Sequence, residues 1–132
     1  MLDVTLSIDS KEVHAMSVHG PWTAPPTDTD ETLRQAEIIA KHIKGLDDQP
    51  FILAGDFNMP PGSKVIETIS SVCKNLTEGI GGQTLNLNIH KFGRDGFFVD
   101  HIFASYYFKL NSVEVLNEDV SDHLPVVSTL EF

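Results

Sequence analysis

The chain has 132 residues, of which 41% are hydrophobic and 21% charged, and its net charge at pH 7 is −10. This length suits one compact domain, and the composition excludes a disordered chain. No apolar run approaches the roughly 18 to 20 residues of a membrane span, and no export signal is visible, so we expect a cytoplasmic protein unless a longer amino terminus carries one. The single cysteine, Cys73, excludes a disulfide framework and a thiolate metal site.

The charge balance bears on the class of ligand. The 19 acidic side chains outnumber the 9 basic ones, so the surface repels phosphate polyanions at long range. A bound divalent metal ion would reverse the local field at a site. The charge therefore disfavours long duplex DNA without excluding other phosphate esters.

The amino-terminal segment predicts a β-hairpin. Apolar and polar residues alternate over Asp3–Asp9 and again over Glu12–His19, with Ser10-Lys11 as the joint. His19 ends the second strand and precedes Gly20-Pro21, where side chains often reach a cleft. A lone histidine in such a place is more often a structural hydrogen-bonding group, so the residues alone leave its role open.

An amphipathic helix is predicted from Asp30 to Leu46, after a loop over Thr23–Thr29 that ends in residues suited to cap it. Its apolar residues recur at spacings of three and four. Acidic residues at its start and basic ones near its end match the helix dipole. A buried strand over Phe51–Ala54 follows, and this succession is typical of an α/β layer.

The stretch Phe51–Asn58 stops at a carboxylate and an amide two residues apart. Because strand side chains alternate, Asp56 and Asn58 should lie on one side of the backbone. The following Pro60-Pro61-Gly62 forces a turn. We therefore expect this polar pair at the rim of a sheet, where it would mark a site.

The remaining chain predicts a helix, a long surface loop and three strands. The helix runs from Lys64 to about Cys73, which is expected to be a buried small hydrophobe at its end. The loop covers Asn75–Arg94. Three residues of this loop could contact a phosphate: His90, Lys91 and Arg94. Exposed loop charges, however, are more often only solvated. The strands are expected at residues 97–103, 110–116 and 124–130.

Carboxylates and histidines gather at the predicted strand ends. Asp100 interrupts an apolar run and needs a cation or a histidine as partner, because burying an unpaired carboxylate is costly. Asp122 and His123 stand side by side before the last strand. Phosphate-ester hydrolysis needs a metal-binding carboxylate, a group that positions water and a cation that faces the phosphoryl oxygens.

Three short motifs, taken together, resemble a known family. They are Gly55-Asp56-Phe57-Asn58, Asp100-His101-Ile102-Phe103 and Ser121-Asp122-His123, after the strand that ends at His19. In this order they resemble the carboxyl-terminal half of the endonuclease/exonuclease/phosphatase superfamily, which has the deoxyribonuclease I-like fold. The resemblance implies one α/β (α+β) domain over residues 1–132, with a mostly antiparallel sheet, helices on one face, and the shape of half a four-layer α/β/β/α sandwich.

The resemblance also implies an activity and its residues. Family members are hydrolases that act on phosphoester bonds with Mg²⁺ or Mn²⁺, as nucleases, phosphodiesterases or phosphatases. The aspartate and asparagine of the first motif engage water and phosphate or a metal, and the histidine of the third pairs with the aspartate of the second. The implied catalytic residues are His19, Asp56, Asn58, Asp100 and His123, and the implied metal ligands are Asp56, Asn58 and Asp122.

One departure from the family pattern concerns the metal. Members carry an asparagine and a principal Mg²⁺-binding glutamate in an amino-terminal half, and Asp3, Asp9 and Glu12 do not stand in a matching context. We expect either a piece of a longer enzyme or a naturally short relative, with weakened Mg²⁺ binding. A half sandwich would also leave an apolar sheet face uncovered, which predicts a homodimer or a missing amino-terminal half.

Two other functions stay open. A truncated or non-catalytic remnant of the fold would keep the motifs and act as a binding or structural unit, and the missing glutamate favours it. An acidic protein-interaction module would require the motifs to be coincidences. The sequence also leaves the substrate undecided among DNA, RNA, phosphoinositides, sphingomyelin and other phosphate esters of the family.

Overall fold

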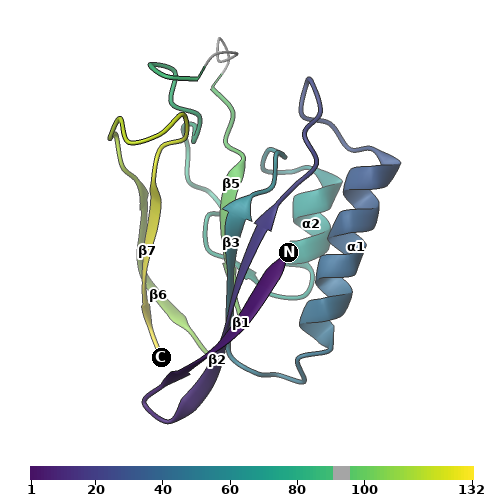
Figure 1. The fold of residues 1–132 in the computed structure, drawn as a ribbon, viewed down its shortest axis with the longest axis vertical. Helices are drawn as coiled ribbons and strands as arrows, with labels where there is room; N and C mark the ends of the chain where they lie inside the picture. The colour runs from purple at the N-terminus through teal and green to yellow at the C-terminus, as the bar shows by residue number, and fades with distance from the viewer. Residues whose placement is uncertain (91–95) are drawn as a thin grey trace.

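The computed structural model describes residues 1–90 and 96–132. Within this part of the chain, two helices, a five-stranded sheet and a two-stranded sheet form three layers, with the larger sheet in the middle (Figure 1). The helices are α1 (Asp30–Lys44) and α2 (Lys64–Ser70). The strands are β1 (Leu2–Ile8), β2 (Lys11–His19), β3 (Phe51–Asp56), β4 (Lys74–Asn75), β5 (Asp100–Ala104), β6 (Lys109–Val115) and β7 (Val126–Glu131).

The larger sheet has the strand order β1-β2-β3-β5-β4. β2 and β3 are parallel, since α1 carries the chain back between them, and the other neighbours are antiparallel. Thr29 caps α1 by accepting a hydrogen bond from the Thr32 N–H, and acidic residues fill the first turn. The predicted fold class is confirmed: a mixed α/β chain, mostly antiparallel, with helices on one face.

The face of this sheet under the helices, called here the closed face, carries most of the core. β3 contributes Phe51 and Leu53 to it, and β5 contributes Phe103. The helices meet them with the apolar stripe that their spacing predicts, and Phe57 contacts Phe103 edge to face within this core. The closed face is therefore sealed by the chain's own helices.

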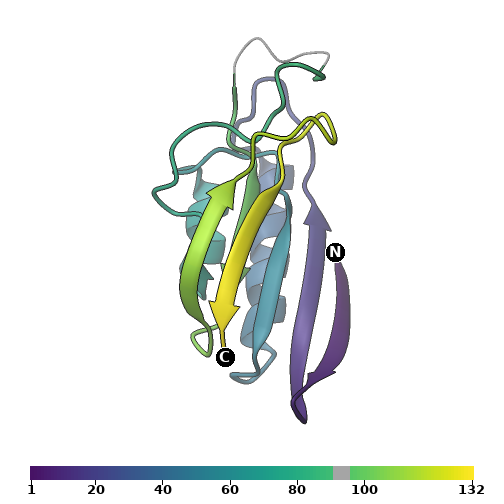
Figure 2. The same ribbon diagram turned by 90° about the vertical axis from the view of Figure 1, so that its left-hand side faces the viewer.

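The opposite face, called here the open face, is covered only in part. Val13, Ile102 and Ala104 pack against Val126 and Leu130 of the small sheet. Figure 2 shows β6 and β7 in front of one side of the larger sheet, with β1 and β2 standing clear of them. The apolar residues of β1 alternate on this face and remain exposed by 63% at Leu2, 42% at Val4, 45% at Leu6 and 49% at Ile8.

The polar side of β1 is tied to the closed side of the sheet by Asp3. Its carboxylate oxygens lie 3.0 Å from Nδ1 of His14 and 2.7 Å from Nε2 of His42 on α1. Burial alone would raise the pKa of Asp3, but these two hydrogen bonds hold it below its ordinary value. The hydrogen bond to Asp3 outweighs burial at His14 and raises the pKa of that imidazole.

Several predicted boundaries need correction. α2 ends at Ser70, and Cys73 lies beyond it, buried, with its Sγ donating to the Ile69 carbonyl. Residues 97–99 are not strand, because their backbone bonds to the 84–85 segment and to Phe57 instead of forming a regular ladder. Lys91 and Arg94, named above for phosphate contacts, lie outside the described residues.

The long surface loop predicted over Asn75–Arg94 is wrong for its first part. Residues 74–75 form β4, which pairs with β5, and Leu76, Thr77, Thr84 and Asn86 are buried. The burial of Thr84 and Asn86 could not be read from the sequence pattern, because both are polar and bond to distant segments. In residues 1–90 and 96–132, neither helix is long and apolar enough to cross a membrane.

Candidate active site

Three of the predicted site residues are cross-strand neighbours at one end of the larger sheet. His19 of β2 pairs in register with Asp56 of β3, which pairs in turn with Asp100 of β5. β2 and β3 end here and β5 begins here, so the three side chains project from adjacent strand ends. Nε2 of His19 lies 3.6 Å from Oδ2 of Asp56.

His123 comes to the same place from the loop before β7. Its Nδ1 lies 2.8 Å from Oδ2 of Asp100, and its Nε2 lies 3.9 Å from Oδ2 of Asp56. Asp100 therefore has the histidine partner that its position predicts. Burial alone would lower the pKa of His123, but the Asp100 hydrogen bond and the neighbouring carboxylates together raise it. The site thus favours a cationic imidazole beside two acids.

Asp56 sits between the two imidazoles. Its Oδ1 accepts a hydrogen bond of 2.8 Å from the backbone N–H of Asn58. The pKa of Asp56 is raised, mainly because burial disfavours its charge and also because Asp100 is near; the Asn58 N–H and the two histidines partly offset this. A carboxylate with a raised pKa is a better proton acceptor than an exposed one.

The backbone around Asp56 requires small residues at two places. Gly55 has φ 156°, and a Cβ there would lie 2.0 Å from the Val18 carbonyl oxygen. A Cβ on Gly20 would lie 2.3 Å from the carbonyl oxygen of Phe57. Asn58 itself has φ 53°, a left-handed conformation that asparagine tolerates, and its side-chain amide donates to the Gly20 carbonyl. The Gly-Asp-Phe-Asn motif is thus a backbone requirement as well as a set of side chains.

The segment 84–86 supports the site, and sequence reasoning missed it. Oγ1 of Thr84 accepts from the N–H groups of Val99 and Asp100, and its carbonyl accepts from Leu124. Asn86 donates from its backbone to the Asp122 carbonyl and from its side chain to the Ser121 carbonyl. These bonds join β5 to the Ser-Asp-His loop, and no local pattern signals contacts between segments so far apart.

The six predicted residues differ in how they face the solvent. Five of them line one cavity of about 570 Å³, called here the strand-end cavity: His19, Asp56, Asn58, Asp122 and His123. Asp100 does not line this cavity, but its carboxylate lies 2.8 Å from Nδ1 of His123. The cavity is also lined by His90 and by Trp22, whose side chain is 66% exposed at the rim. This volume suits a small organic ligand or the end of a larger one.

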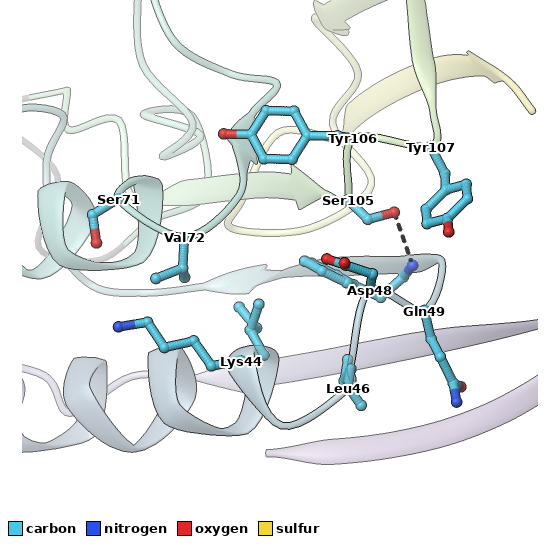
Figure 3. A pocket seen from close by; sticks show the side chains of 11 residues that line it. Lys44, Leu46, Asp48, Gln49, Ser71, Val72, Ser105, Tyr106 and Tyr107 are labelled. Carbon is cyan, nitrogen blue, oxygen red and sulfur yellow. Dashed lines mark hydrogen bonds between the residues drawn. The ribbon is translucent and has the colours of Figure 1, made fainter.

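A second hollow of about 630 Å³ lies at the other end of the sheet. Figure 3 shows Tyr106 and Tyr107 on one side of it and Lys44 and Leu46 on the other. It is slightly larger, but its lining includes neither a histidine nor a pair of acids. The chemistry therefore points to the strand-end cavity.

Donor groups of two kinds that could hold a metal ion line the strand-end cavity. Asp56 and Asn58 offer carboxylate and amide oxygens, the donors that Mg²⁺ prefers, and Asp122 lines the same cavity. One atom each of His90, Asp122 and His123 also lie within 4.8 Å of one another. The oxygen donors fit the divalent ion that the resemblance implies.

The sequence profile of the Endonuclease/Exonuclease/phosphatase family matches residues 3–123. The chain belongs to this family. The resemblance drawn from the three motifs is thereby confirmed. A search of curated proteins finds no match.

Solved structures share the fold of this family member. A mannosyl-6-phosphatase from Bacteroides thetaiotaomicron is 23% identical, with a TM-score of 0.76 over 94% of this chain and 53% of that chain. An endonuclease/exonuclease/phosphatase from Bacteroides vulgatus is 25% identical, with a TM-score of 0.73 over 93% and 51%. TDP2 from D. rerio, complexed with a single-strand DNA product, is 14% identical, with a TM-score of 0.78 over 98% and 60%. The chain thus spans a little over half the length of these proteins.

Proposed function

We propose that residues 1–132 are the carboxyl-terminal half of a metal-dependent phosphoesterase domain. The observation that carries this proposal is the chain of contacts from Asp100 to His123 and on toward Asp56, with His19 on the other side of Asp56. An acid that orients an imidazole beside a second acid is an arrangement suited to proton transfer and to the binding of an anionic phosphoryl group. Family membership supports the same reaction class.

Each residue has a role in this proposal. His123, whose pKa Asp100 raises, hydrogen-bonds a phosphoryl oxygen and stabilises the charge that grows there, and His19 does the same from the opposite side. Asp56 accepts a proton from the attacking water, and the N–H of Asn58 holds the Asp56 carboxylate in place. A divalent ion on the oxygens of Asp56, Asn58 and Asp122 would act as a Lewis acid toward the phosphoryl group.

The substrate of this chain is a phosphomonoester or phosphodiester small enough to place its phosphate in the strand-end cavity. The relatives named above include a sugar-phosphate phosphatase and a protein bound to single-strand DNA, and both kinds of ligand carry such a phosphate. The net charge of −10 argues against long duplex DNA, whose affinity depends on neutralising many phosphates.

The test is hydrolysis of p-nitrophenyl phosphate and bis(p-nitrophenyl) phosphate with Mg²⁺ or Mn²⁺. Asp56→Asn and His123→Ala should each lower the rate by at least about 100-fold, as expected for loss of a general acid or base. Asp48→Asn makes the same chemical change at the other hollow and should leave the rate unchanged. Metal-dependent hydrolysis that survives both site substitutions would refute the proposal.

The open face supports a further part of the proposal, a homodimer or a missing amino-terminal half. The exposed apolar residues of β1 would be buried by either partner. For the homodimer, sedimentation equilibrium should show self-association that Leu6→Glu weakens. Ile38→Glu is the matched control, because Ile38 is an exposed apolar residue on the outer side of α1. A monomer at micromolar concentration would exclude the homodimer, and a missing amino-terminal half would then be the partner that covers the open face.

A second candidate function is a non-catalytic remnant of the fold. The chain covers only about half of its structural relatives, and the glutamate that the family uses for Mg²⁺ has no counterpart in the sequence. This candidate expects no Mg²⁺ binding by calorimetry and no turnover of either nitrophenyl substrate. Measurable Mg²⁺-dependent turnover that depends on Asp56 would eliminate it.

A further inference from the structure

A cluster in the strand-end cavity has a donor set unlike that of a magnesium site. His90 and His123 each bring an imidazole nitrogen and Asp122 a carboxylate oxygen, all within 4.8 Å of one another. The two rings are 6.2 Å apart between centroids, with their planes at 74°. His90 and His123 are half-buried and Asp122 is exposed, so the cluster opens to the cavity.

Imidazole nitrogen selects a different class of ion. Mg²⁺ takes oxygen ligands almost throughout, whereas imidazole suits Zn²⁺, Cu²⁺, Ni²⁺ and Fe²⁺. Two histidines and one carboxylate, with a fourth position left for water, is a common zinc arrangement. Ligand atoms around a tetrahedral Zn²⁺ lie about 3.4 Å apart, as bond lengths of about 2.0–2.1 Å require, so side-chain rotations of modest size bring these three into range.

The protein already holds the cluster in place. Nδ1 of His123 is engaged by Asp100 at 2.8 Å, which turns Nε2 toward the cavity in the manner of a carboxylate–histidine–metal triad. The buried Asn86 ties the other two ligand segments together: its N–H donates to the Asp122 carbonyl at 2.9 Å, and its carbonyl accepts from the His90 N–H at 2.7 Å. The three ligands therefore come from segments whose spacing is set by a buried hydrogen-bonding residue.

We propose that His90, Asp122 and His123 form a binding site for a transition-metal dication such as Zn²⁺, which shares Asp122 with the proposed Mg²⁺ site but takes imidazole nitrogens in place of the oxygens of Asp56 and Asn58. Binding of the ion occupies Nε2 of His123. If the chain hydrolyses phosphoesters as proposed above, bound Zn²⁺ prevents this imidazole from hydrogen-bonding the phosphate. Zn²⁺ therefore acts as an inhibitor.

The experiment measures Zn²⁺ binding to the purified chain by competition with a chromophoric chelator, so it needs no hydrolysis. Wild type should bind one Zn²⁺, His90→Gln should weaken binding by at least about tenfold, and a large excess of Mg²⁺ should not displace the ion. His42→Gln is the matched control, because it removes a partly exposed histidine whose carboxylate partner is Asp3. Circular dichroism verifies that each variant is folded.

A second measurement separates coordination from loose surface binding. Co²⁺ in place of Zn²⁺ should give the visible absorption of a tetrahedral or five-coordinate ion in wild type, and His90→Gln should lose it while His42→Gln keeps it. Zinc affinity unchanged by His90→Gln would overturn the proposal. Equal weakening by His42→Gln, or a Co²⁺ spectrum of the octahedral aqua ion, would overturn it as well. If these binding results hold while the nitrophenyl assay shows no turnover, the metal site stands and the proposed hydrolase does not.

Discussion

The closed and open faces of the five-stranded sheet both carry alternating apolar side chains, but they differ in what covers them. Leu53 on the closed face is fully buried under the helices, whereas Leu6, on the open face, is 45% exposed. The candidate active site lies at the end of the sheet, where Asp56 and His19 project from strands shared by both faces. The helices of the chain thus cover the closed face fully, whereas its small sheet covers the open face only in part.

The sharpest test of this contrast is a pair of leucine truncations. Leu53→Ala should destabilise the chain by about 3 kcal/mol, since it removes buried methyl groups and leaves a cavity. Leu6→Ala should cost less than about 1 kcal/mol in a monomer, because water already reaches the side chain. Urea unfolding, at protein concentrations too low for self-association, measures the free energy of unfolding of both variants. Equal losses of unfolding free energy in the two variants would show that Leu6 is as well buried as Leu53.

A second prediction concerns the site end of the closed face. Gly55→Ala should destabilise by about 2 kcal/mol, because the new Cβ collides with the Val18 carbonyl and the φ of 156° disfavours any side chain. Gly81→Ala is the control, since a Cβ there meets nothing within 4 Å. Thermal unfolding of the two variants measures the difference. A Gly55→Ala variant as stable as Gly81→Ala would contradict the close approach of β2 and β3.

A smaller loss of stability is expected when the contacts of Asp3, which attach β1 to His14 and His42, are removed. Asp3→Asn removes the charge that raises the pKa of His14, so it should cost about 1 kcal/mol near pH 6. The His14 contribution is complete below the ordinary histidine pKa of about 6.5 and is lost as the pH rises through the raised folded value. The Asp3 contribution is lost only in acid, as the pH falls through its lowered pKa.

The measurement for this prediction is urea unfolding of wild type and Asp3→Asn at pH 6 and pH 8.5. The stability difference should shrink between the two values. A difference that grows with pH would show that the raised His14 pKa does not stabilise the attachment of β1.

The positions of the candidate site residues could be predicted from the sequence better than the segments that support them. Alternation predicted the hairpin, and the short motifs predicted that Asp56 and Asp100 lie at strand ends and that a histidine pairs with Asp100, because each of these signals is local. Burial of Thr84 and Asn86 was missed, since both are polar and their partners lie in distant segments. β1 was also predicted incompletely: its apolar residues alternate as in a half-buried strand, yet Leu6 is exposed. Alternation shows which side is apolar but not what covers it.

In the proposed site, the imidazole of His123, its orienting acid Asp100 and the second acid Asp56 bind a phosphoryl group. Titration of His123 by NMR tests this proposal most directly, with or without turnover. The pKa of His123 should lie above the ordinary histidine value, rise further when inorganic phosphate is added, and fall in Asp100→Asn. A His123 pKa that is the same in wild type and Asp100→Asn and does not change with phosphate would contradict the proposed site.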